Sequence, residues 1–168
     1  RVLELGTSLG VGAAHLAAAL ALNEADGAPH GRLVTLGGAP TLAAQAAGHL
    51  ARLGHGVGED AGCRVRVVVG PFAETLPAVA TEEGPFDLVF VDGHHEAEAA
   101  LHYLGLLDAH LADGALIVLD DVEPYAGKYG LLLHARPGAD ALASGTAEGA
   151  TTRPARETPP LPTSAGDA

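Results

Sequence analysis

A glycine-rich loop follows the first apolar segment of the chain and leads into a segment rich in Ala and Leu. The motif reads ELGTSLGVG, in which Glu4 precedes Gly6, Ser8, Gly10 and Gly12. Glycines let a backbone turn sharply and approach a ligand closely, and the N-terminus of a following helix attracts a carboxylate or a phosphate. Because an acidic Glu4 disfavours a pyrophosphate and favours an ammonium group, the motif predicts a site for a zwitterionic amino-acid moiety. The alternative is an ordinary strand-to-helix turn.

Two common nucleotide-binding motifs are missing from this glycine-rich loop. No Gly-Lys-Ser/Thr sequence ends it, as a P-loop requires. The GxGxxG spacing is also absent, which argues against a nicotinamide-dependent Rossmann enzyme.

Three aspartates form the second candidate site. Asp92 ends the apolar run FDLVFVD, and Asp120 and Asp121 end the run ALIVLDD. If these runs are neighbouring parallel strands, the three carboxylates converge, and like charges that close require a neutralising cation. Oxygen-only ligands suit Mg²⁺ or another hard divalent ion. The alternative is that Asp120 and Asp121 cap a loop and Asp92 caps a helix.

Histidines and the cysteine add little to these two sites. His94 and His95 follow Asp92 directly, at the mouth of the predicted site. The other seven histidines show no ligand spacing and are interpreted as solvated helix or loop residues. Cys63 has no neighbour that marks it as a nucleophile, so we interpret it as structural.

The elements that position these residues alternate in type along the chain. Apolar runs predict strands at 1–5, 32–36, 64–69, 86–92 and 115–121. Between them we expect helices at 13–22, 41–53 and 93–111, and a loop with a short helix at 70–80. In the 93–111 helix, the three- and four-residue spacing of Leu101, Leu104, Leu107 and Leu111 predicts its buried face. An ADG turn (112–114) follows this helix.

This alternation predicts a doubly wound, Rossmann-like α/β fold, with a mostly parallel sheet in a three-layer α/β/α arrangement. Right-handed crossovers then place the carboxyl ends of all the strands along one edge, where ligands bind. Residues 129–135 could form one more helix or strand, and without a strand there the sheet is incomplete at its C-terminal edge. We expect a core domain over residues 1–136 and a low-complexity, disordered tail over 137–168.

Composition excludes several classes of partner. The chain has 9 Lys and Arg against 21 Asp and Glu, a formal charge of −12, and no basic run. We therefore expect neither nucleic acid nor an anionic membrane as a partner. No apolar run is long enough to span a bilayer, and we expect no signal peptide before the first strand. A single cysteine is compatible with a reducing cytoplasm.

At these residues the chain resembles class I S-adenosylmethionine-dependent methyltransferases, and more closely their catechol O-methyltransferase-like branch, over about residues 1–122. ELGTSLGVG resembles the loop that binds the methionine end of the cofactor. RLVTLGGAP resembles the second strand and its turn, and VVVGPFAETLP resembles the segment that lines the adenine. FDLVFVDGHHEAE and LIVLDDV resemble the two strands at the catalytic edge.

The resemblance implies a methyltransferase that acts on a hydroxyl of a small molecule, with S-adenosylmethionine and with Mg²⁺ or another divalent cation as cofactors. Its implied site residues fall into four groups. The methionine moiety is surrounded by Glu4, Gly6, Ser8, Gly10 and Gly12, and the adenine by Gly70, Pro71 and Phe72. Asp92, Asp120 and Asp121 match metal ligands, and Asp92 is also expected to be a cofactor-binding and a catalytic residue. His95 stands where animal catechol enzymes have a catalytic lysine and would act as a general base.

Two departures from the family leave an alternative open. The acidic residue that usually ends the second strand and binds both ribose hydroxyls is replaced by Gly37. The helices that usually precede the first strand, and a convincing final strand pair, are also missing. A truncated or diverged, non-catalytic cofactor-binding or interaction domain is therefore the second hypothesis. The sequence does not identify the methyl acceptor, and it leaves open whether two copies form a homodimer.

Overall fold

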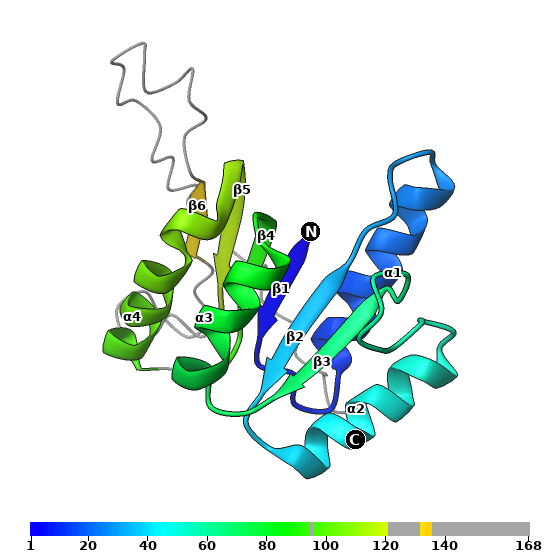
Figure 1. The fold of residues 1–168 in the computed structure, drawn as a ribbon, viewed down its shortest axis with the longest axis horizontal. Helices are drawn as coiled ribbons and strands as arrows, with labels where there is room; N and C mark the ends of the chain where they lie inside the picture. The colour runs from blue at the N-terminus through cyan, green and yellow to red at the C-terminus, as the bar shows by residue number, and fades with distance from the viewer. Residues whose placement is uncertain (95, 121–131, 136–168) are drawn as a thin grey trace, which may run out of the picture.

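A single mixed sheet organises the chain. The computed structural model describes residues 1–94, 96–120 and 132–135. Within these residues six strands form a sheet in the order β3-β2-β1-β4-β5-β6, in which β1 to β5 are parallel and β6 is antiparallel to β5 (Figure 1). The strands are β1 (Val2–Leu5), β2 (Leu33–Gly37), β3 (Val65–Val69), β4 (Phe86–Val91), β5 (Leu111–Leu119) and β6 (Leu132–Ala135). The predicted doubly wound, mostly parallel fold is confirmed.

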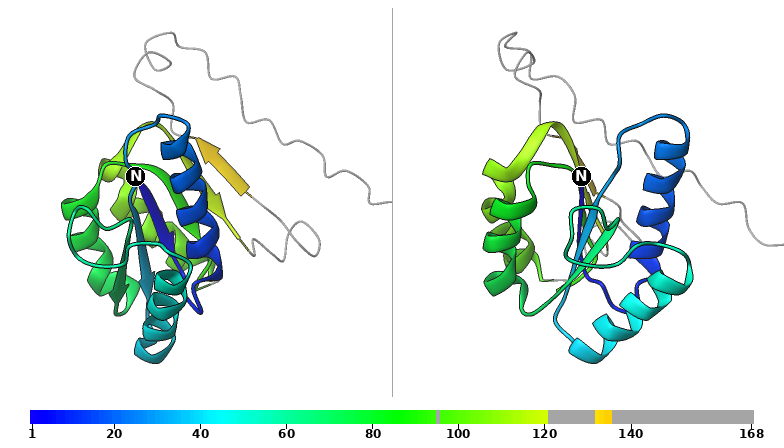
Figure 2. Two further views of the ribbon diagram at one scale, coloured as in Figure 1. Left: turned by 90° about the vertical axis from the view of Figure 1, so that its right-hand side faces the viewer. Right: turned by 45° about the vertical axis from the view of Figure 1, so that its right-hand side comes forward.

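Helices cover both faces of this sheet. Figure 2 shows α1 (Val11–Ala25) and α2 (Pro40–Arg52) on one face, and α3 (Phe72–Glu83) and α4 (Ala97–Leu107) on the other. Small side chains bring α1 close to the sheet, since Ala13 and Ala17, one turn apart, are its buried residues. In α2 the first residue is Pro40, at a position where a missing N–H group breaks no helical hydrogen bond.

The strands supply apolar side chains to both layers of helices. Val2 and Leu33 pack with the buried alanines of α1, whereas Leu3, Leu5 and Leu36 pack in the cluster that includes the buried residues of α3 and α4. Successive residues of a strand point to opposite faces. An almost continuous apolar strand is therefore buried on both sides, as parallel sheets require.

The region after β4 differs from the sequence prediction. The helix expected over 93–111 is shorter, because α4 begins at Ala97, ends at Leu107 and is followed by a 3-10 helix (Asp108–His110). The predicted ADG turn lies inside β5, where the pairing register with β4 shifts and Gly114 has a positive φ of 78°. The leucine spacing predicted the buried face of this region only in part, since Leu107 and Leu111 are buried and Leu104 packs against the core, but Leu101 does not. Leu101 is 70% exposed, whereas Tyr103, two residues and therefore about 200° further round the helix, is buried.

Two further predictions were incomplete. Where a loop and a short helix are expected at 70–80, the structure has the twelve-residue helix α3, which begins at Phe72 and contains Pro77. Prolines at 71 and 77 made a long helix improbable from sequence, since an internal proline removes a backbone hydrogen bond. Of the segment 129–135, which could have been helix or strand, residues 132–135 form β6. The predicted tail over 137–168 lies outside the described residues. None of the described helices combines the length and apolarity that a bilayer crossing requires.

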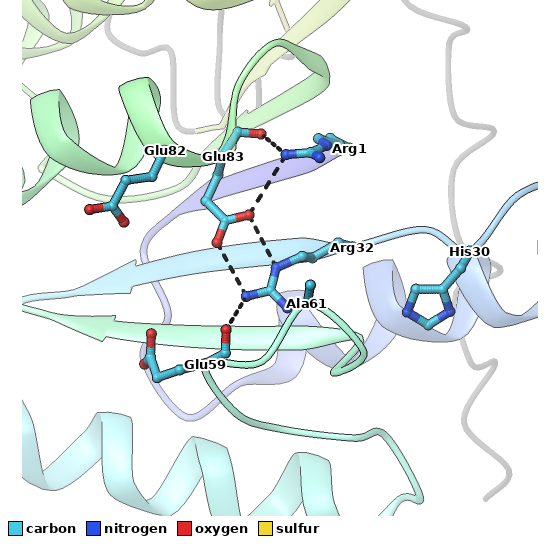
Figure 3. Close-up of a pocket in the computed structure, with 7 residues that line it drawn as sticks. All are labelled: Arg1, His30, Arg32, Glu59, Ala61, Glu82 and Glu83. Atoms are coloured by element: carbon cyan, nitrogen blue, oxygen red, sulfur yellow. Dashed lines mark hydrogen bonds and ion pairs between the residues drawn. The ribbon is translucent and has the colours of Figure 1, made fainter.

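Buried ion pairs hold the amino edge of the sheet together (Figure 3). Arg32, which directly precedes β2, donates from Nε and Nη2 to the two carboxylate oxygens of Glu83, at 3.1 and 3.2 Å. The same guanidinium donates to the carbonyl oxygens of Glu59, Asp60 and Cys63, at 3.0, 2.5 and 2.9 Å. Arg32 is 9% exposed and Glu83 is 8% exposed, so neither charge can be left unpaired without a large desolvation cost.

We predict that Glu83→Gln lowers the free energy of unfolding by about 3 kcal/mol, because it leaves the buried Arg32 charge without its carboxylate partner. Glu82→Gln is the matched control on the neighbouring residue, whose side chain is 56% exposed and pairs with Arg66. This control should cost less than about 1 kcal/mol. Urea unfolding of the two variants measures both values, and equal losses would contradict the account.

Candidate functional site

The glycine-rich loop (residues 6–12) adopts left-handed backbone conformations that favour glycine. Gly6 and Gly10 have φ values of 127° and 83°, and Ser8 has a φ of 45°. The Gly6 and Thr7 N–H groups both donate to the carbonyl oxygen of Leu36, at 2.9 and 3.0 Å. The loop is thereby fixed to the carboxyl end of β2, as well as to β1, from which it emerges.

The same loop contacts the carboxyl end of β4. The Asp92 N–H donates to the Leu5 carbonyl oxygen at 2.8 Å. A β-carbon on Gly6 would overlap the Asp92 carbonyl oxygen and lie 2.6 Å from its carbonyl carbon. Any side chain at position 6 would therefore force the loop and the end of β4 apart. The sheet order reverses between β1 and β4, which is the position where doubly wound sheets bind ligands.

Helix α1 presents an uncapped N-terminus above this loop. Its N-cap is Gly10, no side chain caps it, and its first turn contains no acidic residue. Its free N–H groups and partial positive charge are suited to an anionic ligand group. A β-carbon on Gly10 would lie 3.0 Å from the β-carbon of Ala46, so α2 packs closely against the loop at this residue.

Glu4 is a buried acid under the first turn of α1. It is 1% exposed, and a β-carbon on Gly12 would overlap its Oε1 atom. Thr35 of β2 donates to Glu4 Oε2 at 2.5 Å, and the Thr7 and Thr35 hydroxyl oxygens are 2.7 Å apart. Burial raises the pKa of Glu4 from 4.5 to about 7, against the hydrogen bond from Thr35, which lowers it, and with a smaller upward contribution from the charge of Asp92.

The aspartates that were predicted as metal ligands are only partly described. Asp92 is half-buried and Asp120 is exposed. The Asp120 N–H donates to the Val91 carbonyl oxygen at 2.9 Å, which extends the β4–β5 pairing by one residue and puts the two aspartates side by side in the backbone. Asp121 and His95 lie outside the described residues. Among residues 1–94, 96–120 and 132–135, no group of three or more His, Cys, Asp or Glu side chains could hold a metal ion.

An aromatic cluster connects the segment predicted to line the adenine with the end of β4. Gly70 has a φ of 150°, and Pro71 is the N-cap of α3, which begins at Phe72. The Phe72 ring packs edge-to-face on Tyr103 with ring centroids 5.6 Å apart. A β-carbon on Gly93 would lie 3.2 Å from Phe72 Cε2 and 3.3 Å from Gly6 Cα. The segments predicted to bind the two ends of the cofactor therefore meet at Gly93.

Sequence reasoning missed three residues that shape this site. Thr7 and Thr35 form the hydroxyl chain to Glu4. Tyr103 packs on Phe72, and its hydroxyl is 2.7 Å from His94 Nδ1. The one available signal was Thr35, a lone polar residue in the apolar strand RLVTL. A hydroxyl on a buried strand indicates a buried hydrogen-bond partner on a neighbouring strand.

A cavity of about 300 Å³ lies at the opposite, amino edge of the sheet (Figure 3). Charged side chains dominate its lining, which consists of Arg1, His30, Arg32, Glu59, Ala61, Glu82 and Glu83. The buried Arg32–Glu83 ion pair forms part of this wall. None of the residues predicted from the glycine-rich loop or from the aspartates lines it, so we assign this cavity to the ion-pair network and not to the candidate site.

Comparison with known proteins identifies relatives of the described core. A family described as "Methyltransferase domain" matches residues 3–122. The chain is 40% identical over 122 residues to a catechol O-methyltransferase of Mycobacterium tuberculosis, a match that covers 73% of this chain and 48% of that protein. The chain therefore spans about half the length of this curated relative.

Solved structures give the same result. The O-methyltransferase TomG from Streptomyces achromogenes, in complex with SAM, is 32% identical with a TM-score of 0.58, over 71% of this chain and 48% of that one. An O-methyltransferase from Bacillus cereus, in complex with SAH, is 27% identical with a TM-score of 0.57, over the same shares of the two chains, 71% and 48%.

We predict that Glu4 makes the folded state less stable as the pH rises from about 4.5 to about 7. The folded protein keeps the Glu4 proton up to about pH 7, whereas the unfolded chain releases it near pH 4.5. Stability then falls with pH across this window, by roughly 3 kcal/mol at 1.4 kcal/mol per pH unit. Glu4→Gln removes this slope, which urea unfolding at several pH values measures. Parallel curves for the wild type and the variant would contradict the burial of Glu4.

Glu24→Gln is a control of opposite sign for this measurement. The hydrogen bond from Arg64 is the largest cause of a lowered Glu24 pKa. A carboxylate with a lowered pKa adds stability above its unfolded pKa and loses it as the pH falls. Its removal should therefore abolish a rise in stability with pH below about 4.5 and leave the fall between about 4.5 and 7 in place, whereas Glu4→Gln removes that fall.

Proposed function

The chain belongs to the methyltransferase domain family, and from this premise we propose that it binds S-adenosylmethionine at the carboxyl edge of the sheet and methylates a hydroxyl of a small molecule. The observation that supports this most strongly is the close approach between Gly6 and Asp92. It unites the glycine-rich loop with the strand end where the acidic residues begin. A cofactor on the loop and an acceptor beside the acids would then be neighbours.

The methionine end of the cofactor fits the residues of the glycine-rich loop. Its carboxylate would accept from the free N–H groups at the start of α1, where the helix dipole adds to the attraction. Its ammonium group would be attracted by the negative charge of Glu4, which is buried under the same turn. In this proposal Gly6, Ser8, Gly10 and Gly12 supply the backbone that surrounds the methionine moiety.

The adenine end would lie against the start of α3. Gly70 and Pro71 lead into Phe72, and the Phe72 ring is held by its edge-to-face contact with Tyr103. Because Phe72 and Gly6 both approach Gly93, one extended ligand could contact the loop and the ring together.

The acidic residues would position the acceptor. Asp92 and Asp120 are adjacent in the extended β4–β5 pairing, and with Asp121 they would offer only oxygen ligands, which fit Mg²⁺ or another hard divalent ion. Such an ion, when bound, lowers the pKa of a hydroxyl that coordinates it. We propose that these aspartates hold the ion beside the cofactor, and that His95 accepts the acceptor's proton as a general base.

In methyl transfer the protein has to hold the acceptor oxygen in position relative to the methyl group of the cofactor. The cofactor supplies a methyl group on a sulfonium centre, and the acceptor oxygen must lie in line with it. The loop and the end of β4 are in backbone contact, so they can fix both partners relative to each other. The strongly acidic charge of −12 supports a small neutral or cationic acceptor over nucleic acid.

The single cysteine supports a reducing compartment such as the cytoplasm.

Calorimetric titration with S-adenosylhomocysteine tests the cofactor site. We predict micromolar binding by the wild type, and binding weakened about tenfold or more by Glu4→Gln, since hydrogen bonds and ion pairs to charged groups contribute about 1.5–3 kcal/mol. Glu82→Gln, at the opposite edge of the sheet, is the control and should bind like the wild type. No heat at high micromolar ligand would refute the proposal for this chain.

Turnover separates the enzyme from the second hypothesis of a non-catalytic cofactor-binding domain. The chain is incubated with S-adenosylmethionine and catechol, with Mg²⁺ or with a chelator, and methylated catechol is measured by mass spectrometry. Methylated product that disappears with the chelator supports both the methyltransferase and its metal. Binding of S-adenosylhomocysteine without product from any catechol-like acceptor would support the non-catalytic domain, which the relatives do not favour.

A further inference from the structure

We propose that Thr7 and Gly37 together remove carboxylate recognition of the cofactor ribose, so that the site accepts donors that lack a ribose hydroxyl. The inference rests on the proposed function, because it concerns the same cofactor site. It makes Thr7 and Gly37 specificity-determining residues, and it moves cofactor recognition to the methionine and adenine ends.

Position 37 is where a ribose-binding acid would stand. In doubly wound nucleotide-binding sheets, an acidic residue that follows the second strand hydrogen-bonds the ribose hydroxyls. Here β2 ends at Gly37, which is buried, and the turn continues as Gly38 and Ala39. No Asp or Glu occurs between Asp26 and Glu59. Strand β2, its turn and α2 therefore supply no carboxylate that could replace the missing one.

Thr7 occupies the space that a side chain at position 37 would enter. A β-carbon on Gly37 would lie 3.0 Å from both Cβ and Oγ1 of Thr7, which is tighter than ordinary van der Waals contact. Thr7 cannot easily give way, since it is 1% exposed and its N–H donates to the Leu36 carbonyl oxygen at 3.0 Å. Glycine at 37 and threonine at 7 are therefore sterically coupled.

The Thr7 hydroxyl does not take over the role of the missing acid. Thr35 uses its single hydroxyl proton on the Glu4 carboxylate, so Thr7 must donate to Thr35 Oγ1, 2.7 Å away. Thr7 and Thr35 are 1% and 0% exposed, and the chain of hydroxyls leads inward to Glu4. Because both side chains are buried and both hydroxyl protons are used within this chain, neither threonine can donate to a ribose at the surface of the loop.

The wild-type chain gives the first test. Calorimetry compares S-adenosylhomocysteine with its 2′-deoxy and 3′-deoxy analogues, so the readout is a ratio of affinities and not activity. We expect the three dissociation constants to agree within about threefold, because strand β2, its turn and α2 offer no carboxylate to bind either hydroxyl.

Three variants test the coupling between the two positions. In Thr7→Gly/Gly37→Glu both atoms that crowd position 37, Cβ and Oγ1 of Thr7, are removed, so the new carboxylate has room. We expect a preference of about tenfold or more for S-adenosylhomocysteine over the deoxy analogues. Gly37→Glu alone should not gain this preference, because Thr7 blocks the first carbon of the new side chain. Thr7→Gly alone should keep the wild-type ratio, and thermal unfolding of each variant shows whether it is folded.

Each outcome decides between distinct claims. A wild type that prefers S-adenosylhomocysteine to either deoxy analogue by more than about tenfold would overturn this inference and leave the proposed function standing. Equal preference in the folded Gly37→Glu single variant and in the double variant would overturn the role of Thr7. If the wild type binds neither S-adenosylhomocysteine nor its analogues, the proposed function fails, and this inference fails with it.

Discussion

The backbone contact between Gly6 and Asp92 is the constraint on which the site depends. Glycine alone fits at position 6, because its φ is 127° and a β-carbon there would overlap the carbonyl oxygen of Asp92. The contact brings the end of β1 against the end of β4 at the reversal of strand order. Through Gly93, the same point reaches Phe72 at the start of α3. Three segments that are distant in sequence are thus held within one edge of the sheet.

The buried acids at the two edges of the sheet have different neighbours. At the amino edge, the carboxylate of Glu83 is buried against the guanidinium of Arg32, so two opposite charges offset each other's desolvation. At the carboxyl edge, the neighbours of Glu4 are the hydroxyl of Thr35 and the like charge of Asp92, and its pKa rises to about 7. A buried acid that has no cationic partner among the described residues is costly for stability. A cationic ligand group beside Glu4 would recover that cost, which links the instability of this edge to the proposed binding of an ammonium group.

Structural features that depend on the local sequence pattern were predicted from the sequence. Apolar runs and turn glycines gave the order of the elements, and the parallel-sheet rule then put Gly6 and Asp92 at one edge. Prediction from sequence failed where contacts between distant segments determine the structure. The leucine spacing of α4 is regular, yet Leu101 faces solvent, because Tyr103 packs against Phe72 of α3 and sets the orientation of the helix. Thr7 fills the space where a side chain at position 37 would lie, although the two residues belong to different loops. No periodicity in either segment indicates this contact.

The central claim is that the carboxyl edge, and not the charged cavity at the amino edge, binds the cofactor. Amide chemical-shift mapping by NMR during a titration with S-adenosylhomocysteine tests it directly. The account predicts the largest changes at Gly6, Gly10, Gly12 and Gly93, with little change at Arg32. Changes centred on Arg32 and Glu83, or absent from the glycine-rich loop at saturating ligand, would contradict it.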